Sequence, residues 1–125
     1  HFYMLTNYLL ILVDFSVVCG QRTNEEQFKL YLQGRQQIDR GQFIIQDKSK
    51  IVTNIDGVKK KSKHNYSPSK AIDIIPYPMG YKSIEQFHYL AGVVLTISKW
   101  FGIPLKWGGN WKSLKDYPHF ELKEK

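Results

Sequence analysis

Two short polar clusters, far apart along the chain, carry the side chains that could do chemistry. The first leads from His64 to Asp73, and the second leads from Asp116 to His119. Together they supply two imidazoles, one carboxylate in an apolar stretch and one spare carboxylate. A catalytic zinc site needs such a set, with three protein ligands, an open position for water and a base beside it. Metal-assisted hydrolysis is therefore the first chemistry to consider.

Asp73 lies between isoleucines in a stretch, 71–76, that is typical of a central strand. An unpaired carboxylate buried there would cost on the order of several kcal/mol, so it needs a cation or strong hydrogen-bond donors. A metal ion would meet that need, whereas a place at a strand edge would let Asp73 pair with Lys70. His64 lies on the preceding loop, where the turn at 67–69 could fold it toward Asp73 or leave it in solvent.

His119 begins the second cluster's expected strand, 119–122, whose alternation places Glu121 on the same face and Phe120 toward the core. Asp116 precedes His119 by three residues, but Pro118 disfavours a helix there and implies a tight turn. In such a turn Asp116 could reach a metal-bound water without ligating the metal. Two imidazoles and one carboxylate suit zinc, and Asp116 would then act as the base.

Arg22 is the candidate electrophilic partner, because a guanidinium can stabilise an oxyanion or hold a substrate carboxylate. The alternative is a surface arginine near a helix N-terminus. Cys19 is the single cysteine, which excludes an intramolecular disulfide and a cysteine-rich zinc site. We expect Cys19 to pack as a small hydrophobe in a buried strand.

The elements that must position these residues follow from periodicity and caps. We expect three helices. The first covers 2–12, the second runs from a capping box at Thr23 and Glu26 to Gly34, and the third covers 83–100. Strands are expected over 13–19, 71–76, 104–107 and 119–122, while 35–63 holds only weak pieces at 42–45 and 51–52. Because helices and strands do not alternate strictly, the pattern predicts one α+β domain over 1–125. Its helices should pack on one side of a small, mainly antiparallel sheet.

The amino-acid composition and net charge narrow the range of possible binding partners. The 125 residues carry a net charge of +7, with 42% hydrophobic and 23% charged residues, which suits a globular domain drawn to polyanions such as nucleic acid, anionic lipid or bacterial wall polymers. The lysines at 59–61 and 63 lack interleaved aromatics, so we expect a solvated loop and no nucleic-acid partner. The apolar stretch 2–18 is interrupted by Asn7 and Asp14, so we interpret it as core rather than signal peptide or membrane insertion. We expect a monomer.

Several segments resemble one family in their order along the chain. They are Gly20-Gln21-Arg22-Thr23, Gln33-Gly34-Arg35, Ser62-Lys63-His64-Asn65-Tyr66, Ala71-Ile72-Asp73, Trp107-Gly108-Gly109-Asn110-Trp111 and Asp116-Tyr117-Pro118-His119-Phe120-Glu121. This order is similar to that of the VanY-like zinc peptidases, the superfamily of D-alanyl-D-alanine carboxypeptidases and L-alanyl-D-glutamate peptidases common among phage endolysins. The resemblance covers about residues 13–122.

The resemblance implies a zinc ion bound by His64, Asp73 and His119, with Asp116 as general base and Arg22 assisting at the carbonyl or a substrate carboxylate. It also implies an α+β fold shared with the hedgehog signalling domain, and bacterial peptidoglycan stem peptides as substrate. We expect an L-alanyl-D-glutamate endopeptidase. The alternatives are a D-alanyl-D-alanine carboxypeptidase and, from another class, a non-catalytic wall-binding or signalling domain with a structural zinc.

Two further residues of the matching segments, Ser62 and Trp111, are expected to contact the substrate. One departure concerns the loop between His64 and Asp73, which has eight residues where many relatives have six. The longer loop is similar to that of the endolysin-like branch. A second departure is Asn110, where relatives often have Asp.

Overall fold

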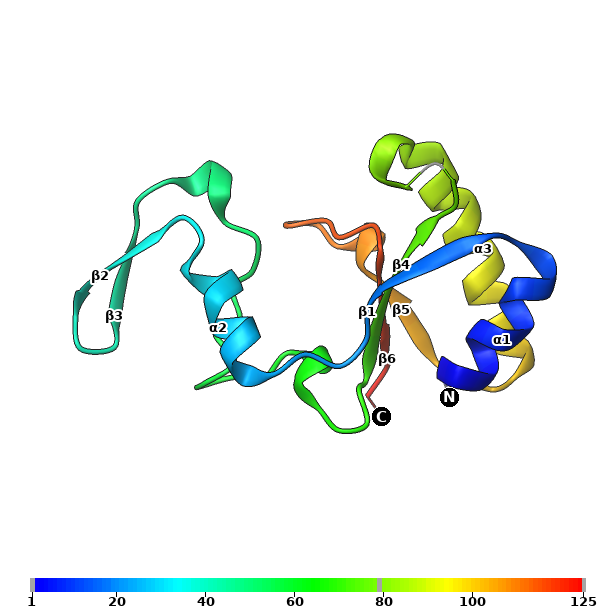
Figure 1. Ribbon diagram of the computed structural model, residues 1–125, viewed down its shortest axis with the longest axis horizontal. Helices are drawn as coiled ribbons and strands as arrows, with labels where there is room; N and C mark the ends of the chain where they lie inside the picture. Colours follow the sequence, from blue (N-terminus) through cyan, green and yellow to red (C-terminus); the bar gives the residue numbers. More distant parts are fainter. Residues whose placement is uncertain (1, 79, 125) are drawn as a thin grey trace.

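A four-stranded antiparallel sheet forms the frame of the molecule (Figure 1). The computed structural model describes residues 2–78 and 80–124. The strands lie in the order β1-β4-β6-β5. Their bounds are Phe15–Cys19 for β1, Ala71–Pro76 for β4, His119–Leu122 for β6 and Leu105–Trp107 for β5. The strands expected at 71–76 and 119–122 are confirmed residue for residue, and the other two are each shorter than expected.

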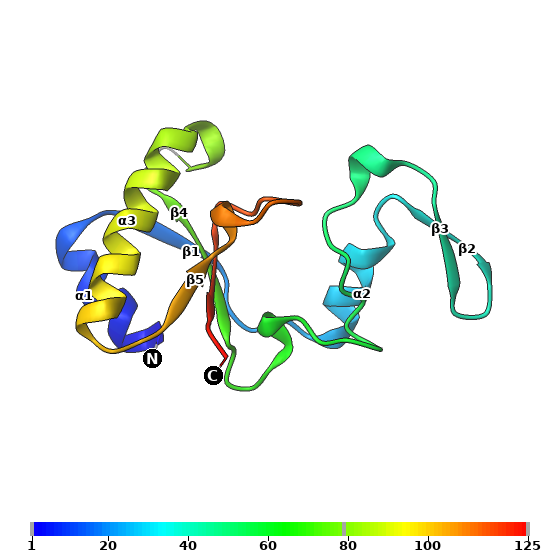
Figure 2. The same cartoon turned by 180° about the vertical axis from the view of Figure 1, so that it is seen from behind.

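Helices α1 (Phe2–Leu12) and α3 (Ile84–Trp100) pack side by side on one face of this sheet (Figure 2). Their buried apolar residues recur at helical spacing and meet the inward residues of the strands. The core formed in this way includes Leu5, Leu9, Phe87, Leu90, Val94, Ile74 and Phe120. The α+β class and the packing of these helices on one side of the sheet are therefore confirmed. Across the described residues, no helix is both long and apolar enough to cross a membrane.

The ends of the helices follow their capping residues. Thr23 forms a complete capping box with Glu26 at the start of α2 (Asn24–Leu32), and the Ser83 hydroxyl accepts a hydrogen bond from the Gln86 amide at the start of α3. Gly34 follows α2 with a φ of +81°, a conformation that glycine adopts without strain.

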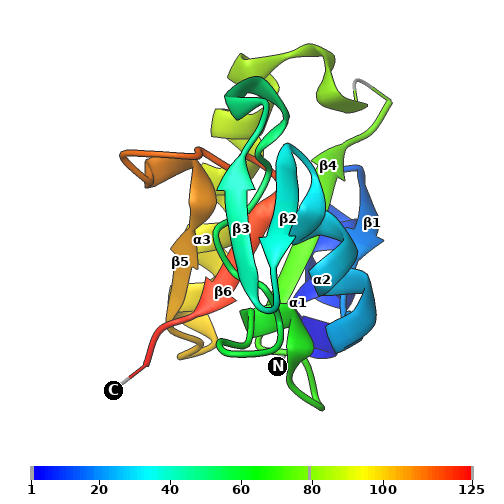
Figure 3. The same ribbon diagram turned by 90° about the vertical axis from the view of Figure 1, so that its left-hand side faces the viewer.

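Helix α2 and a two-stranded hairpin form an arm on the opposite side of the sheet from α1 and α3 (Figures 1 and 3). The hairpin pairs β2 (Arg35–Asp39) with β3 (Gln42–Ile45). Only β3 was expected, because the sequence of β2 is polar and the strand is largely exposed. The strand-like piece expected at 51–52 is not a strand in the structure, so that prediction was wrong.

Candidate metal centre

Strand register sets three polar residues in one row on the sheet face that points away from α1 and α3. Cys19 of β1 pairs with Asp73 of β4, and Asp73 pairs with His119 of β6. Directly opposed residues in an antiparallel sheet point to the same face. Because Ile72 and Ile74 face the hydrophobic core, Asp73 must face the arm.

His64 reaches this row from a short capped turn, η2 (Lys63–Asn65). The Ser62 hydroxyl accepts a hydrogen bond from the His64 amide at 3.2 Å, and the Asn65 side chain accepts one from the Ser62 amide at 2.8 Å. The His64 carbonyl in turn accepts from the Arg22 amide at 2.8 Å, which ties the turn to the chain after β1. His64 is only 2% exposed, so the loop delivers it into the cluster rather than into solvent.

The three predicted ligands meet at one point. His64 Nε2 lies 3.2 Å from Asp73 Oδ1 and 3.2 Å from His119 Nδ1, and the latter two atoms lie 3.1 Å apart. The sheet and the loop thus bring together atoms from residues that are 9 to 55 positions apart.

The outer nitrogen of each imidazole has a partner that can only accept a hydrogen bond. His64 Nδ1 donates to the Gly20 carbonyl at 2.6 Å, and His119 Nε2 donates to Glu121 Oε1 at 3.1 Å. In the neutral rings, the inner nitrogens must therefore carry lone pairs that face Asp73. Metal-ligating histidines are oriented in this way, since the partner of the outer nitrogen fixes the tautomer.

A tetrahedral ion fits this arrangement. Bonds of about 2.0–2.1 Å to nitrogen and oxygen place the ligand atoms of such an ion roughly 3.3 Å apart, close to the separations of 3.1–3.2 Å seen here. Two imidazole nitrogens and one carboxylate oxygen also match the donors that zinc prefers.

The side chains themselves favour positive charge at the centre of the cluster. Burial opposes the charged form of His119, but hydrogen bonds with Asp73 and Glu121 outweigh it and raise the pKa of the imidazole to about 9. Burial also acts against the charged form of Asp73, yet hydrogen bonds from His119 and His64 hold the pKa of this carboxyl well below its usual range. A metal ion would therefore displace a proton from the cluster, which makes its binding dependent on pH.

Asp116 lies beside the cluster. One of its carboxylate oxygens is within 4.8 Å of ligand atoms of both Asp73 and His119. The tight turn expected from the sequence is present, with the Asp116 amide donating to the Gly108 carbonyl at 3.1 Å and the His119 amide donating to the Asp116 carbonyl at 3.2 Å. Burial, together with the charge of Asp73, raises the pKa of Asp116. A carboxylate with a raised pKa is better matched to accepting and returning a proton near neutral pH.

Arg22 contacts the cluster and is not the surface residue of the alternative interpretation. Its guanidinium lies 3.7 Å from Asp73 Oδ2, and its side chain is 17% exposed. It donates to Gln27 Oε1 at 2.8 Å and to the Cys19 sulfur at 3.5 Å.

Gln27 also belongs to the segments that carry the family resemblance, but it was not among the expected site residues. It is 1% exposed, and its amide group bridges two parts of the molecule. Gln27 Oε1 accepts from Arg22, while Nε2 donates to the Ile55 carbonyl at 2.8 Å. A polar residue in a helix gives no signal of such a contact, because its partners lie elsewhere in the chain.

Cys19 also lies closer to the site than expected. With His64 and Asp73 it forms a second group whose ligand atoms lie within 4.8 Å of one another. Its sulfur is 3.8 Å from His64 Nδ1, the nitrogen already committed to the Gly20 carbonyl. Burial raises the pKa of the thiol although Arg22 opposes this, so Cys19 is the weaker ligand candidate.

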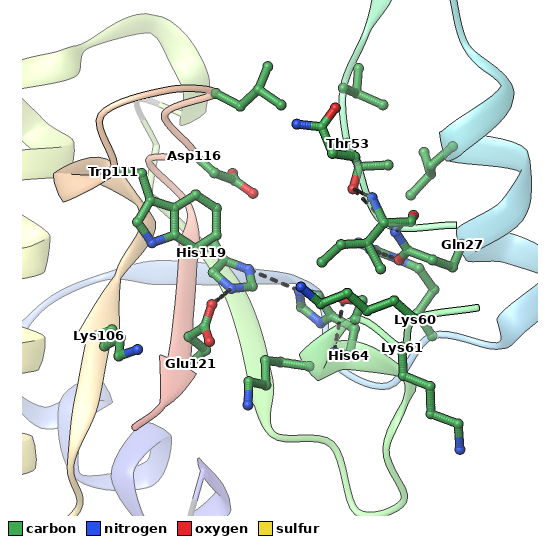
Figure 4. A pocket seen from close by; sticks show the side chains of 18 of the residues that line it. Gln27, Thr53, Lys60, Lys61, His64, Lys106, Trp111, Asp116, His119 and Glu121 are labelled. Carbon is green, nitrogen blue, oxygen red and sulfur yellow. Dashed lines mark hydrogen bonds and ion pairs between the residues drawn. The ribbon is translucent and has the colours of Figure 1, made fainter. Parts of the chain in front are cut away.

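The two predicted substrate contacts lie at an open cleft of about 1290 Å³ between the sheet and the arm (Figure 4). The Trp111 ring lies beside the His119 ring, with centroids 5.0 Å apart, and both line the cleft. Ser62 also lines it, but the Ser62 hydroxyl is engaged in capping η2. A contact of either residue with substrate stays a prediction.

The fold and the cluster define a class of small α+β proteins that carry a His-Asp-His centre in a cleft beside a spare carboxylate. Residues 56–122 match a family model described as D-alanyl-D-alanine carboxypeptidase, and the chain belongs to this peptidase family.

Two relatives support this assignment. Over 118 residues the chain is 34% identical to the peptidoglycan L-alanyl-D-glutamate endopeptidase CwlK of Bacillus subtilis (strain 168), covering 88% of this chain and 61% of the relative. The chain therefore spans less than two thirds of that protein's length. The crystal structure of the L-Ala D-Glu endopeptidase ChiX of Serratia marcescens superposes with a TM-score of 0.59 at 25% identity, covering 90% of this chain and 68% of that chain.

Gly108 should be required for the position of Asp116. A Cβ added at Gly108 would lie 2.4 Å from the Asp116 carbonyl oxygen and 3.1 Å from the His119 Cβ. We expect Gly108→Ala to lower the free energy of unfolding by about 1–3 kcal/mol, because backbone must move. The control is Gly92→Ala in α3, where an added Cβ meets nothing within 4 Å. It should raise stability slightly, and equal effects of the two changes in urea unfolding would contradict the close approach.

Gln27→Leu should remove the acceptor of Arg22 and leave the Ile55 carbonyl without its donor. We expect a loss of about 1–3 kcal/mol in the free energy of unfolding, the usual cost of an unsatisfied buried polar group. Gln36→Leu, on the exposed strand β2, is the matched control and should change stability by no more than about 0.5 kcal/mol. Urea unfolding of both variants measures the difference, and a Gln27 variant as stable as the control would show that the bridge contributes nothing.

Proposed function

We propose that this protein is a zinc-dependent peptidase that cleaves an amide bond in the stem peptides of bacterial peptidoglycan, and that the bond is the one between L-alanine and D-glutamate. The observation that carries the proposal is the convergence of two imidazole nitrogens and one carboxylate oxygen within 3.2 Å of one another. The names of the relatives CwlK and ChiX support the choice of bond.

His64, Asp73 and His119 would hold the zinc ion. When bound, zinc supplies a Lewis acid and lowers the pKa of a water molecule to about 7. Gly20 and Glu121 keep the two imidazoles in the tautomers that ligation needs.

Asp116 acts as the general base. Its carboxylate accepts a proton from the water as the water oxygen attacks the carbonyl carbon of the substrate. When the carbon–nitrogen bond breaks, Asp116 returns that proton to the leaving amine. Its raised pKa and its position just outside the ligand triangle support both steps.

Arg22, which lies next to Asp73 Oδ2, assists the reaction by contacting the substrate. Its guanidinium is held by Gln27, and it lines the same cleft as Asp116. From there it can stabilise negative charge on the substrate carbonyl oxygen or bind a carboxylate of the peptide.

The main alternative is a D-alanyl-D-alanine carboxypeptidase, which the description of the matching family favours. The cleft of about 1290 Å³ is larger than the roughly 300–1,000 Å³ of a typical small-molecule pocket, and this favours a substrate that continues on both sides of the bond. A non-catalytic domain with a structural zinc would have no use for Asp116 beside the ligands.

Asp116→Asn separates catalysis from metal binding. We expect this variant to retain zinc and to lose hydrolysis of purified peptidoglycan by about 10²–10⁴-fold, the usual contribution of a general base. His119→Ala should lose both zinc and activity. Zinc content by elemental analysis and release of soluble fragments are the measurements. An Asp116 variant that hydrolyses the wall at the native rate would exclude Asp116 as the base.

The bond itself is identified by mass spectrometry of the fragments released from purified peptidoglycan. We expect new N-terminal D-glutamate and free C-terminal L-alanine, and no release when a chelator is present. Release of a single terminal D-alanine would instead establish the carboxypeptidase alternative. Intact peptidoglycan after incubation with the zinc-loaded protein would count against both activities.

A further inference from the structure

The cleft beside the metal centre carries a marked excess of positive charge. Its basic lining residues are Arg22, Lys59, Lys60, Lys61, Lys63, Lys106 and Lys115, against the acidic residues Asp116, Glu121 and Glu124. Lys63 pairs with Glu124, and Lys115 donates to the Gly109 carbonyl. Among residues 2–78 and 80–124, no carboxylate lies within ion-pair distance of the lysines at 59–61 or of Lys106. These four ammonium groups form no ion pair there, although Lys106 lies opposite Glu121 in the pairing of β5 with β6 and Lys61 Nζ lies 5.7 Å from the Tyr66 ring centroid.

The backbone that carries the lysines at 59–61 forms a hydrogen-bonded turn. Asp56 Oδ1 accepts hydrogen bonds from the amides of Val58, Lys59 and Lys60 at 2.9, 2.9 and 3.2 Å. The turn is closed by a bond from the Gly57 amide to the Lys60 carbonyl at 2.9 Å.

The turn is also packed against α2. A Cβ added at Gly57 would lie 2.9 Å from the Cβ of Gln27, the residue that holds Arg22. The lysine side chains are exposed, as expected for a solvated loop, but the backbone that carries them is anchored by these contacts.

The turn lies close to the metal centre. Only three peptide units separate Lys61 from His64, so their Cα atoms are at most about 11 Å apart. An extended peptide advances about 3.3 Å per residue, so the Cα atom of Lys61 lies within roughly three substrate residues of that of His64. Figure 4 shows the Lys60 side chain directed across the cleft toward the imidazoles and Lys106 on the opposite wall, whereas the Lys61 side chain points away from Lys106.

Building on the proposed function, we infer that the lysine turn at 59–61, facing Lys106, binds a free carboxylate of the peptide substrate close to the bond that is cleaved. The metal ligands do not discriminate between amides, whereas a cleft with an excess of positive charge concentrates substrates of opposite charge. Exposed lysines discriminate by charge rather than by shape. They would therefore select acidic stem peptides over neutral ones and leave the chemical step to the cluster.

The test compares two synthetic stem peptides that differ only in whether the carboxyl groups near the scissile bond are free or amidated. The cleft variant is Lys59→Gln combined with Lys60→Gln and Lys61→Gln. The control variant is Lys29→Gln combined with Lys82→Gln and Lys99→Gln, which removes the same charge from exposed lysines outside the cleft. Zinc content verifies that each variant keeps its centre.

We expect the wild type to prefer the acidic peptide in kcat/KM, and this preference to fall about tenfold in the cleft variant, since several partly exposed charge contacts are removed. The control variant should keep the preference. Equal preferences in the two variants would overturn the inference. The inference would also be overturned if the cleft variant kept its preference between the peptides but no longer bound cell walls rich in phosphate polymer. In that case the lysines would bind the wall polymer and not the peptide.

A binding measurement separates this inference from the proposed activity. Calorimetry of the zinc-loaded Asp116→Asn variant with the same two peptides reports charge selection without turnover. If the Asp116→Asn variant binds the acidic peptide preferentially but the wild type cleaves neither peptide, the result contradicts the proposed function and supports the subsite. A protein that cleaves and binds both peptides equally well supports the function and overturns the subsite.

Discussion

The structure depends on one constraint: two imidazole nitrogens and a carboxylate oxygen must share a space only about 3.2 Å across. Such an arrangement is repulsive unless a cation or a shared proton holds it. The molecule fixes it by giving each outer ring nitrogen an acceptor, the Gly20 carbonyl for His64 and the Glu121 carboxylate for His119. Those acceptors lie in the chain after β1 and in β6. The sheet therefore sets which tautomer each imidazole adopts.

Because side chains alternate along each strand, the sheet has one apolar face and one polar face. The face toward α1 and α3 buries residues such as Ile74 and Phe120, and this burial provides the rigidity on which the polar face relies. The polar face holds Asp73 and His119 in adjacent strands. The arm provides the second wall of the cleft, and Gln27 links that wall to Arg22 beside the cluster.

Much of the fold could be predicted because local patterns and tertiary structure agree. The capping box at Thr23, the apolar spacing of α3 and the isoleucine-rich strand β4 each specify an element without distant partners. Strand β2 was missed because it is a polar, exposed strand stabilised mainly by pairing with β3. Cys19 was expected to be a buried hydrophobe, and its place beside Asp73 follows from an irregular register between Val17 and Cys19 that composition does not encode.

The sequence by itself determined the α+β class, most element bounds and the residue types of the candidate centre. These are properties of short segments or of a matching order of segments. Only the tertiary structure decided which nitrogen of each histidine faces inward, that Asp116 stands just outside the ligand triangle, and that Gln27 holds Arg22. The reason is that each of these facts depends on a contact between residues that different strands and loops bring together. Lone-pair direction in particular is set by an acceptor through space, which no spacing along the chain records.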